Sequence, residues 1–172
     1  EIELALQSGF TTEKIFWCDN IINEKDFSKW ILKHSKSLKI IKVSKIVYEK
    51  ITFRKNSEGV LALLKQKETS ILNFKTKNKN PIVLVLESIE KPGNIGAILR
   101  TSEVSKVDAV ILSNTRCDLY NPNLIRSSLG AFFSVQTFVS SNDETLNFLL
   151  KNNFKIFTTI IDANKSYLEN NY

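Results

Sequence analysis

The stretch from Pro81 to Asn114 constrains the fold more than any other part of the sequence. Ile82 to Leu86 is an unbroken run of β-branched and leucine residues, which predicts a strand covered on both faces of a parallel sheet. Lys91-Pro92-Gly93-Asn94 then predicts a turn, because proline cannot continue a strand ladder and glycine permits a tight bend. Asn94 is a good N-cap for a helix that begins around Ile95. A second apolar run, Ala109 to Leu112, completes a β-turn-α-β unit.

The predicted helix after this turn has one apolar face and one arginine. Its apolar and small residues share a face at helical spacing, namely Ile95, Ile98, Leu99 and Ser102. Arg100 falls on the side away from that stripe. Ligands of such sheets bind beyond the carboxyl ends of the strands, so Arg100 is a candidate functional residue. The ordinary alternative is a surface arginine paired with Glu103 or Glu90.

A second donor-rich segment follows downstream. Asp118 to Pro122 reads as a turn into a helix that ends near Gly130 and carries Arg126, Ser127 and Ser128. Arg126 fits either a phosphate clamp or a simple helix-surface cation. Neither this segment nor the Pro92 turn matches the G-x-G-x-x-G dinucleotide pattern or the phosphate-cradling G-x-x-x-x-G-K-[ST] loop.

Two regions of alternating helices and strands are predicted, joined by a linker. Residues 1–66 are predicted as a basic α/β domain, 67–80 as the linker and 81–172 as a second α/β domain with a parallel sheet covered on both faces. In the first, the predicted elements are helices Ile2–Gln7 and Glu24–Lys33 and strands Lys14–Cys18, Leu38–Val43 and Gly59–Leu64. In the second, they are strands Ile82–Leu86, Ala109–Leu112, Val135–Val139 and Phe154–Ile161, and helices Asn94–Ser105, Pro122–Gly130 and Asp143–Asn152.

Composition excludes several classes of protein. Of the 172 residues, 42% are hydrophobic and 24% charged, which is typical of a soluble globular chain. No run approaches the roughly 20 apolar residues that a membrane-spanning helix needs, and the N-terminus does not resemble a signal peptide, so a cytoplasmic protein is predicted. Cys18, Cys117 and the lone His34 lack metal-ligand spacing, which argues against both a metal site and a disulfide.

The positive charge is concentrated in the first half of the chain. Residues 1–80 hold 16 Lys and Arg against 9 Asp and Glu, a net +7, whereas residues 81–172 hold 8 against 9, a net −1. This asymmetry favours a polyanion-binding module joined to a module with another task. A lysine-rich solvated surface is the plain alternative, and charge alone does not choose between them.

The motifs of the second half carry a family resemblance. The run P-x-N-x-G-A-x-x-R-T from Pro92 to Thr101 is followed by V-D-A-V-I-L at Val107 to Leu112 and by Y-N-P-x-x-x-R-x-S-x-G-A-x-F at Tyr120 to Phe132. Together they resemble the SpoU (TrmH-type) family of RNA ribose 2′-O-methyltransferases in the SPOUT superfamily. The resemblance covers roughly residues 81–161. More loosely, the preceding basic region is similar to the small substrate-binding domain often found in front of that catalytic domain.

The resemblance implies a deeply knotted α/β methyltransferase domain that uses S-adenosylmethionine to methylate tRNA or rRNA, usually as a homodimer. Asn94 and Arg100 match its first motif and are the expected catalytic pair. Since a guanidinium stays protonated in proteins, Arg100 is expected to bind phosphate and stabilise the developing 2′-alkoxide while Asn94 orients the loop or the arginine. Arg126, Ser128 and Asn121 match the downstream motif as substrate-binding residues.

The sequence also departs from the family pattern. Glu87 stands where the family often has Asp, and Lys91 replaces a frequent acid before proline. No equivalent of the family's second and third motifs precedes Tyr172. The cofactor-binding residues are therefore expected beyond Tyr172, unless the protein is a non-catalytic relative.

Three functions follow from the sequence in descending order of support. The leading hypothesis is an RNA 2′-O-methyltransferase, because RNA has the 2′-hydroxyl that DNA lacks. The second is an RNA-binding module or pseudo-enzyme without a cofactor pocket. The third is an ordinary nucleotide-binding α/β domain, which the absence of both phosphate-loop patterns disfavours.

Overall fold

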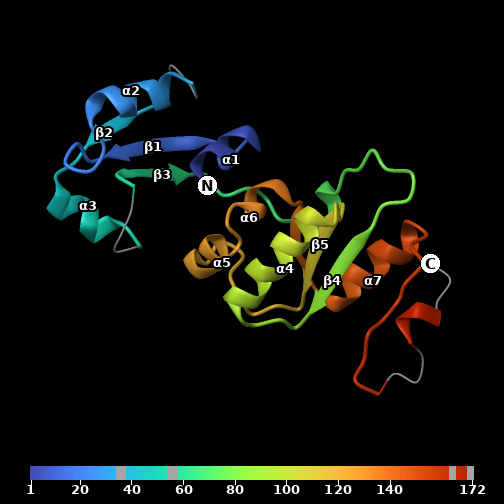
Figure 1. Ribbon diagram of the computed structural model, residues 1–172. Coiled ribbons are helices and arrows are strands. Elements are labelled where there is room, and N and C mark those ends of the chain that lie inside the picture. Colours follow the sequence, from blue (N-terminus) through green and yellow to red (C-terminus); the bar gives the residue numbers. More distant parts are fainter. Residues whose placement is uncertain (34–37, 54–57, 163–165, 170–172) are drawn as a thin grey trace.

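The computed structural model describes residues 1–33, 38–53, 58–162 and 166–169. Its strands form two separate three-stranded sheets, one near each end of an elongated molecule (Figure 1). The first sheet orders its strands β2-β1-β3 and the second β4-β5-β6. These two sheets divide the chain into a first unit and a second unit.

The first unit is a small mixed sheet covered by short helices. Its elements are α1 Ile2–Gln7, β1 Thr12–Trp17, α2 Glu24–Leu32, β2 Ile40–Lys42, α3 Lys45–Ile51 and β3 Val60–Leu64. β1 pairs with β2 in parallel and with β3 antiparallel. Trp17 stacks on Phe27 of α2 with ring centroids 4.6 Å apart, which fixes the helix on the sheet.

Sequence patterns did not predict α3. Ser44 caps it by accepting a hydrogen bond from the Val47 backbone N–H, and Tyr48 is fully buried. The helix spans only seven residues and lacks a long apolar stripe, so packing of Tyr48 rather than periodicity defines it.

The second unit is an all-parallel sheet with helices on both faces, as predicted. Its elements are η1 Ile71–Asn73, β4 Val83–Glu87, α4 Pro92–Val104, β5 Ala109–Ser113, α5 Pro122–Ser127, α6 Ala131–Ser134, β6 Thr137–Ser140 and α7 Asn142–Lys151, with η2 Tyr167–Glu169 beyond it. All five residues of the central strand β5 are buried. Val110 and Leu112 pack with Ile95 and Leu99 of α4, whereas Ile111 packs on the opposite face.

Three predicted elements of the second unit differ from the structure. The helix expected to start near Ile95 begins at Pro92, so Lys91 occupies the N-cap position and Asn94 lies inside the first turn. Proline suits this first helical position because it has no N–H to lose. The helix expected to run to Gly130 ends at Ser127, because Leu129 and Gly130 both adopt positive φ angles, 52° and 103°.

The strand predicted at Phe154–Ile161 is not formed. These residues have no regular secondary structure, and Ile160 and Ile161 are exposed. A strand needs a neighbouring edge to pair its N–H and C=O groups, and in the described ranges no strand pairs with this segment. Apolar, β-branched composition alone therefore gave the wrong prediction here.

The segment between the two units is packed onto the second one. Ile71 is buried against β5 and β6, and the Thr69 carbonyl accepts a hydrogen bond from the Val139 N–H at 3.0 Å. Helix α1 joins the units from the other side: Trp30 donates to Glu3, and Leu4 lies against Gly130. The predicted linker is thus a fixed strap rather than a loose connection.

Among the described residues, no helix combines the length and apolarity needed to cross a bilayer, and no group of three or more His, Cys, Asp and Glu side chains is placed to hold a metal ion. Cys18 and Cys117 are both free thiols. His34 lies outside the described residues.

Candidate active site

Strands β4 and β5 of the second sheet end at the same level, so their carboxyl ends form a common edge. Ser88 follows β4 with φ 52° and Asn114 follows β5 with φ 50°. The Ser88 N–H donates to the Ser113 carbonyl and the Asn114 N–H to the Ser140 carbonyl, each at 2.8 Å. The loops after β4 and β5 therefore leave the sheet from fixed points, and the loop after β4 leads directly into α4.

Arg100 joins the two motifs that the sequence singled out. It projects from α4 as an exposed side chain, and its Nη1 donates to the Ser127 carbonyl at the end of α5, at 2.9 Å. The carboxyl end of a helix carries partial negative charge, so it favours a cation there. A guanidinium has five N–H donors, and the remaining ones stay available for an anionic ligand.

Gly96 allows this contact by letting α4 and α5 approach closely. A Cβ at this position would lie 2.0 Å from the Ser127 Oγ and 2.8 Å from the Ser128 backbone N. No residue larger than glycine fits without moving α5. In the sequence Gly96 is visible only as the glycine of the P-x-N-x-G-A-x-x-R-T run, and its packing role depends on the position of both helices.

Asn94 and Arg100 are not brought together. Asn94 is exposed in the first turn of α4, and six residues of helix place it roughly 9 Å along the axis from Arg100 and on a different face. In the described part of the chain no hydrogen bond links the two side chains. Asn94 is therefore not placed to orient the arginine directly, although it does lie at the mouth of the loop after β4.

Asn121 has a local structural task at the start of α5. Its side-chain oxygen accepts a hydrogen bond from the Asn123 N–H at 2.9 Å, which caps the helix. Asp118 supports the same turn by accepting from the Tyr120 N–H, also at 2.9 Å. The turn that carries the downstream motif is thus held by two side-chain acceptors.

Ser128 and Arg126 lie on opposite sides of the chain. Ser128 is fully buried; its hydroxyl donates to the Ile125 carbonyl at 2.7 Å and accepts from the Phe132 N–H at 3.3 Å. In this conformation it supports the bend between α5 and α6 and does not reach the surface. Arg126 is exposed on α5, one residue before the carbonyl that binds Arg100.

Comparison with known proteins places this site in a family. The model of the SpoU rRNA Methylase family matches residues 81–172, and that of the MRM3-like substrate binding domain matches residues 1–62. A TrmH family tRNA/rRNA methyltransferase of Staphylococcus epidermidis is 33% identical over 168 residues, which span 92% of this chain and 66% of that protein. This chain belongs to the SpoU rRNA methylase family.

Other relatives agree with the SpoU assignment. A tRNA/rRNA methyltransferase of Borreliella burgdorferi is 32% identical over 78% of this chain and 65% of its own length. A solved RNA 2′-O ribose methyltransferase superposes with a TM-score of 0.77 at 30% identity, over 99% of this chain and 64% of that one. This SpoU chain thus spans about two thirds of the length of these relatives.

More distant SpoU structures share the fold. AviRb of Streptomyces viridochromogenes, solved in complex with AdoMet, superposes with a TM-score of 0.76 at 18% identity, over 88% of this chain and 57% of AviRb. At that identity the likeness concerns the arrangement of helices and strands alone.

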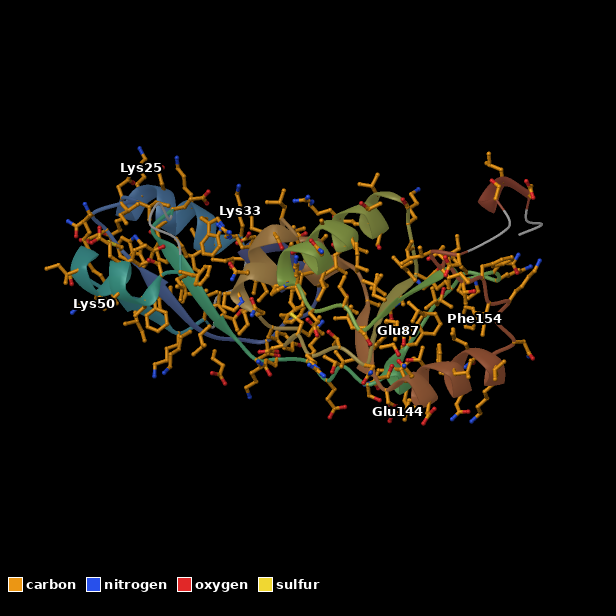
Figure 2. All side chains as sticks on the ribbon, turned by 90° about the horizontal axis from the view of Figure 1, so that it is seen from below. Lys25, Lys33, Lys50, Glu87, Glu144 and Phe154 are labelled. Carbon is orange, nitrogen blue, oxygen red and sulfur yellow. The ribbon has the colours of Figure 1, made fainter. Side chains whose placement is uncertain are left out.

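Polar side chains at the carboxyl edge of this SpoU domain bind one another. The Asn142 amide donates to Glu87 at 3.0 Å and accepts from Ser113 at 2.6 Å, and Ser113 in turn accepts from Thr145 at 3.1 Å (Figure 2 labels Glu87 and, nearby on α7, Glu144). Because these groups satisfy each other, they do not form an open cradle for a cofactor.

A cavity of the described structure lies elsewhere. It measures about 590 Å³ and sits between the strap and the α6–β6 region, with walls that include Phe10, Lys67, Tyr120 and Phe133. Neither Arg100 nor Asn94 lines it. This cavity is therefore separate from the surroundings of Arg100.

Tyr120 is a functional candidate that sequence analysis used only as part of a motif. Its hydroxyl accepts from the Lys67 N–H at 2.7 Å and donates to the Lys67 carbonyl at 2.9 Å. Burial raises the pKa of this phenol. Tyr120 thus ties the strap from the first unit to the loop that begins α5, and no local sequence signal reports a contact between residues 53 positions apart.

Proposed function

We propose that this chain takes part in the S-adenosylmethionine-dependent transfer of a methyl group to a ribose 2′-hydroxyl of tRNA or rRNA. The observation that carries the proposal is the bond from Arg100 to the Ser127 carbonyl, since it joins both family motifs into one exposed cationic site. Family membership and the 30% identity to an RNA 2′-O ribose methyltransferase support the same chemistry.

In this proposal Arg100 acts on the RNA. It remains protonated at any physiological pH, so it is not the base that removes the hydroxyl proton. Its donors that do not bind Ser127 hold the phosphate beside the target nucleotide and stabilise negative charge on the 2′-oxygen. The Ser127 carbonyl holds the guanidinium in place beforehand, so little reorganisation is needed when the RNA binds.

The other predicted site residues take distinct parts. Asn94 contacts the RNA at the mouth of the loop after β4, and Arg126 adds a second phosphate contact on α5. Asn121 and Ser128 act as positioning residues, because the first caps α5 and the second is buried beneath the bend. S-adenosylmethionine supplies the methyl group, and cofactor-binding residues are proposed to lie outside this set.

We infer that residues 1–66 form the RNA substrate-binding domain, 67–80 the connecting strap and 81–172 the methyltransferase domain. The match of residues 1–62 to a substrate-binding domain supports the first assignment. Lys25, Lys33 and Lys50 are exposed on the first unit, where they can attract a polyanion (Figure 2). A homodimer and a deep knot are further parts of the proposal, drawn from the family resemblance. A cytoplasmic location is proposed from the sequence pattern.

The test is a methylation assay with the full chain, undermodified tRNA, rRNA transcripts and labelled S-adenosylmethionine. The expected result is label that stays with a ribose, read as a dinucleotide resistant to alkaline hydrolysis. Label on a base, or an absence of transfer despite bound cofactor, would contradict the proposal.

The second candidate function is RNA binding without catalysis. The polar network around Asn142 favours it, because these side chains at the carboxyl edge of the sheet are already hydrogen-bonded to one another. Calorimetry with S-adenosylmethionine separates the two. Saturable binding supports the enzyme, whereas RNA binding in the absence of cofactor binding supports the non-catalytic module.

A further inference from the structure

The strap carries more positive charge than its length suggests. Residues 67–80 hold four lysines and one glutamate, a net +3 of the +7 in the first 80 residues. The strap packs on the second unit, where the Thr69 carbonyl pairs with β6 and Ile71 is buried. Nearly half of the basic excess of the first half of the chain therefore lies outside the small first domain.

The lysine-bearing loop of the strap is fixed to the amino end of the second sheet. The Asp108 carboxylate, at the entry to β5, accepts from Thr76 at 2.7 Å, from Asn78 at 2.6 Å and from the Ile82 N–H at 2.9 Å. Gln136 at the entry to β6 accepts from the Lys75 N–H at 3.2 Å and donates to its carbonyl at 2.7 Å.

These contacts direct the lysines of the loop outward. Thr76 and Asn78 are tied to Asp108, and the exposed residues Lys75, Lys77 and Lys79 alternate with them along the chain. A fixed backbone lowers the entropy that the loop must lose when it binds a partner. The three ammonium groups are thus presented from a loop whose backbone is already ordered.

An aromatic cluster brings a second basic segment to the same end. Phe74 packs edge-on against Phe148 of α7 and against Phe154 just beyond it, with ring centroids 5.6 and 6.5 Å apart (Figure 2 labels Phe154). Lys151 ends α7 and Lys155 follows Phe154, and both are exposed. Six lysines consequently share the amino end of this sheet, which we term the cationic edge: Lys75, Lys77, Lys79, Lys106, Lys151 and Lys155.

We propose that the cationic edge is a second RNA-binding surface that holds the phosphate backbone away from the target nucleotide. It rests on the proposed function, because RNA is the polyanion that the site at the carboxyl edge would receive. The five-residue strands separate the two edges by about 17 Å, a span that a structured RNA covers easily. Asp108 is an acidic side chain within this surface. Three hydrogen-bond donors bind its carboxylate, so it repels the RNA phosphates little.

The test compares the full chain with a Lys75→Gln, Lys77→Gln, Lys79→Gln variant in binding to unfractionated tRNA at several salt concentrations. Lysines that neutralise phosphates release counterions, and this release makes affinity fall as salt rises. When three such contacts are lost, the slope of log affinity against log salt becomes shallower by roughly 2 to 3. The expected loss of affinity is about tenfold or more at moderate salt, and the matched Lys→Arg triple variant retains wild-type affinity and slope.

A second variant shows whether a loss of binding comes from lost charge or from misfolding of the first variant. Lys151→Gln with Lys155→Gln removes charge from the same surface through a different segment, and a smaller drop in slope, by roughly 1 to 2, is expected. If the parent protein binds tRNA and both glutamine variants keep the wild-type slope, the inference is overturned and the proposed function stays intact. A parent protein that binds neither tRNA nor an rRNA transcript would overturn both. Equal competition by polyglutamate would assign the surface to an acidic protein instead.

Discussion

The two edges of the second sheet present positive charge in different ways. On the helix that leaves the carboxyl edge, Arg100 donates a directed hydrogen bond to the end of α5, which packs closely against Gly96. At the amino edge, the backbone of the lysine loop is fixed by Asp108 while the ammonium groups extend into solvent. Directed bonds suit a reaction that depends on geometry, whereas mobile ammonium groups suit attraction of a polyanion irrespective of its sequence.

The largest effect is expected at Arg100. Arg100→Ala should lower methyl transfer by roughly 100- to 1,000-fold, about 3 to 4 kcal/mol in the barrier, because donors aimed at developing charge are lost. Single-turnover rates on tRNA or rRNA measure it. Arg116→Ala is the matched control, since Arg116 is a highly exposed arginine whose recorded partner is Glu90. Near-normal transfer by Arg100→Ala would remove the distinction between the two edges.

Gly96 tests whether close packing positions the arginine. Gly96→Ala should destabilise the protein by about 1 to 3 kcal/mol, since the new methyl group would overlap the Ser127 Oγ and the Ser128 backbone. Denaturant unfolding measures this. Gly93→Ala is the control, because a Cβ at Gly93 meets nothing within 4 Å. Equal stability of the two variants would contradict the packing argument.

Tyr120 sharpens the comparison because it joins the strap to the loop of the carboxyl edge. Tyr120→Phe removes both hydrogen bonds to Lys67 and leaves the ring in contact with Phe132, so a loss of about 1 to 2 kcal/mol is expected. Hydrogen exchange should rise at the strap and the α5 loop while the first sheet stays protected. Uniform exchange across the chain would instead indicate global destabilisation.

The smallest effect concerns Asp108 and depends on pH. Burial raises the pKa of this carboxyl, but the hydrogen bonds from Thr76, the Ile82 N–H and Asn78 outweigh it, so its pKa is net lowered. Its stabilising effect is therefore present above the ordinary pKa of aspartate and is lost as the pH falls through the lowered value. Asp108→Asn should lower the free energy of unfolding by about 1 kcal/mol near neutral pH. The loss is this small because solvent screens a partly exposed carboxylate.

The measurement is the difference in unfolding free energy between Asp108→Asn and the parent protein from pH 7 down to pH 2. It should shrink as the parent's Asp108 becomes protonated. A difference that grows on acidification would reverse the assigned sign of the pKa shift.

Much of the second unit was predictable because its local signals agree with its packing. The apolar run at β5 and the stripe through Ile95 and Leu99 identified the strand and the helix, and both are buried as expected. The start of α4 was misplaced by a few residues because Pro92 serves equally as a turn residue and as a first helical residue. The strand at Phe154–Ile161 was wrong because composition does not report whether a pairing edge is present.

The candidate site was predictable in its residue types but not in its contacts. Motif spacing identified Arg100 and Arg126, whereas the burial of Ser128 and the separation of Asn94 from Arg100 required coordinates. The linker was recognised by its polarity, yet its attachment through Tyr120 depends on a contact between residues far apart in sequence.

The sequence by itself determined the α/β class, the parallel core, the charge asymmetry and the family motifs, because each depends on residues that are neighbours along the chain. The tertiary structure alone decided that Arg100 meets the end of α5, that Gly96 must be small, and that the strap lysines belong to the second sheet. Those features depend on which surfaces pack together. Packing brings together residues that are far apart in the chain, and the local sequence around one does not predict its contact with the other.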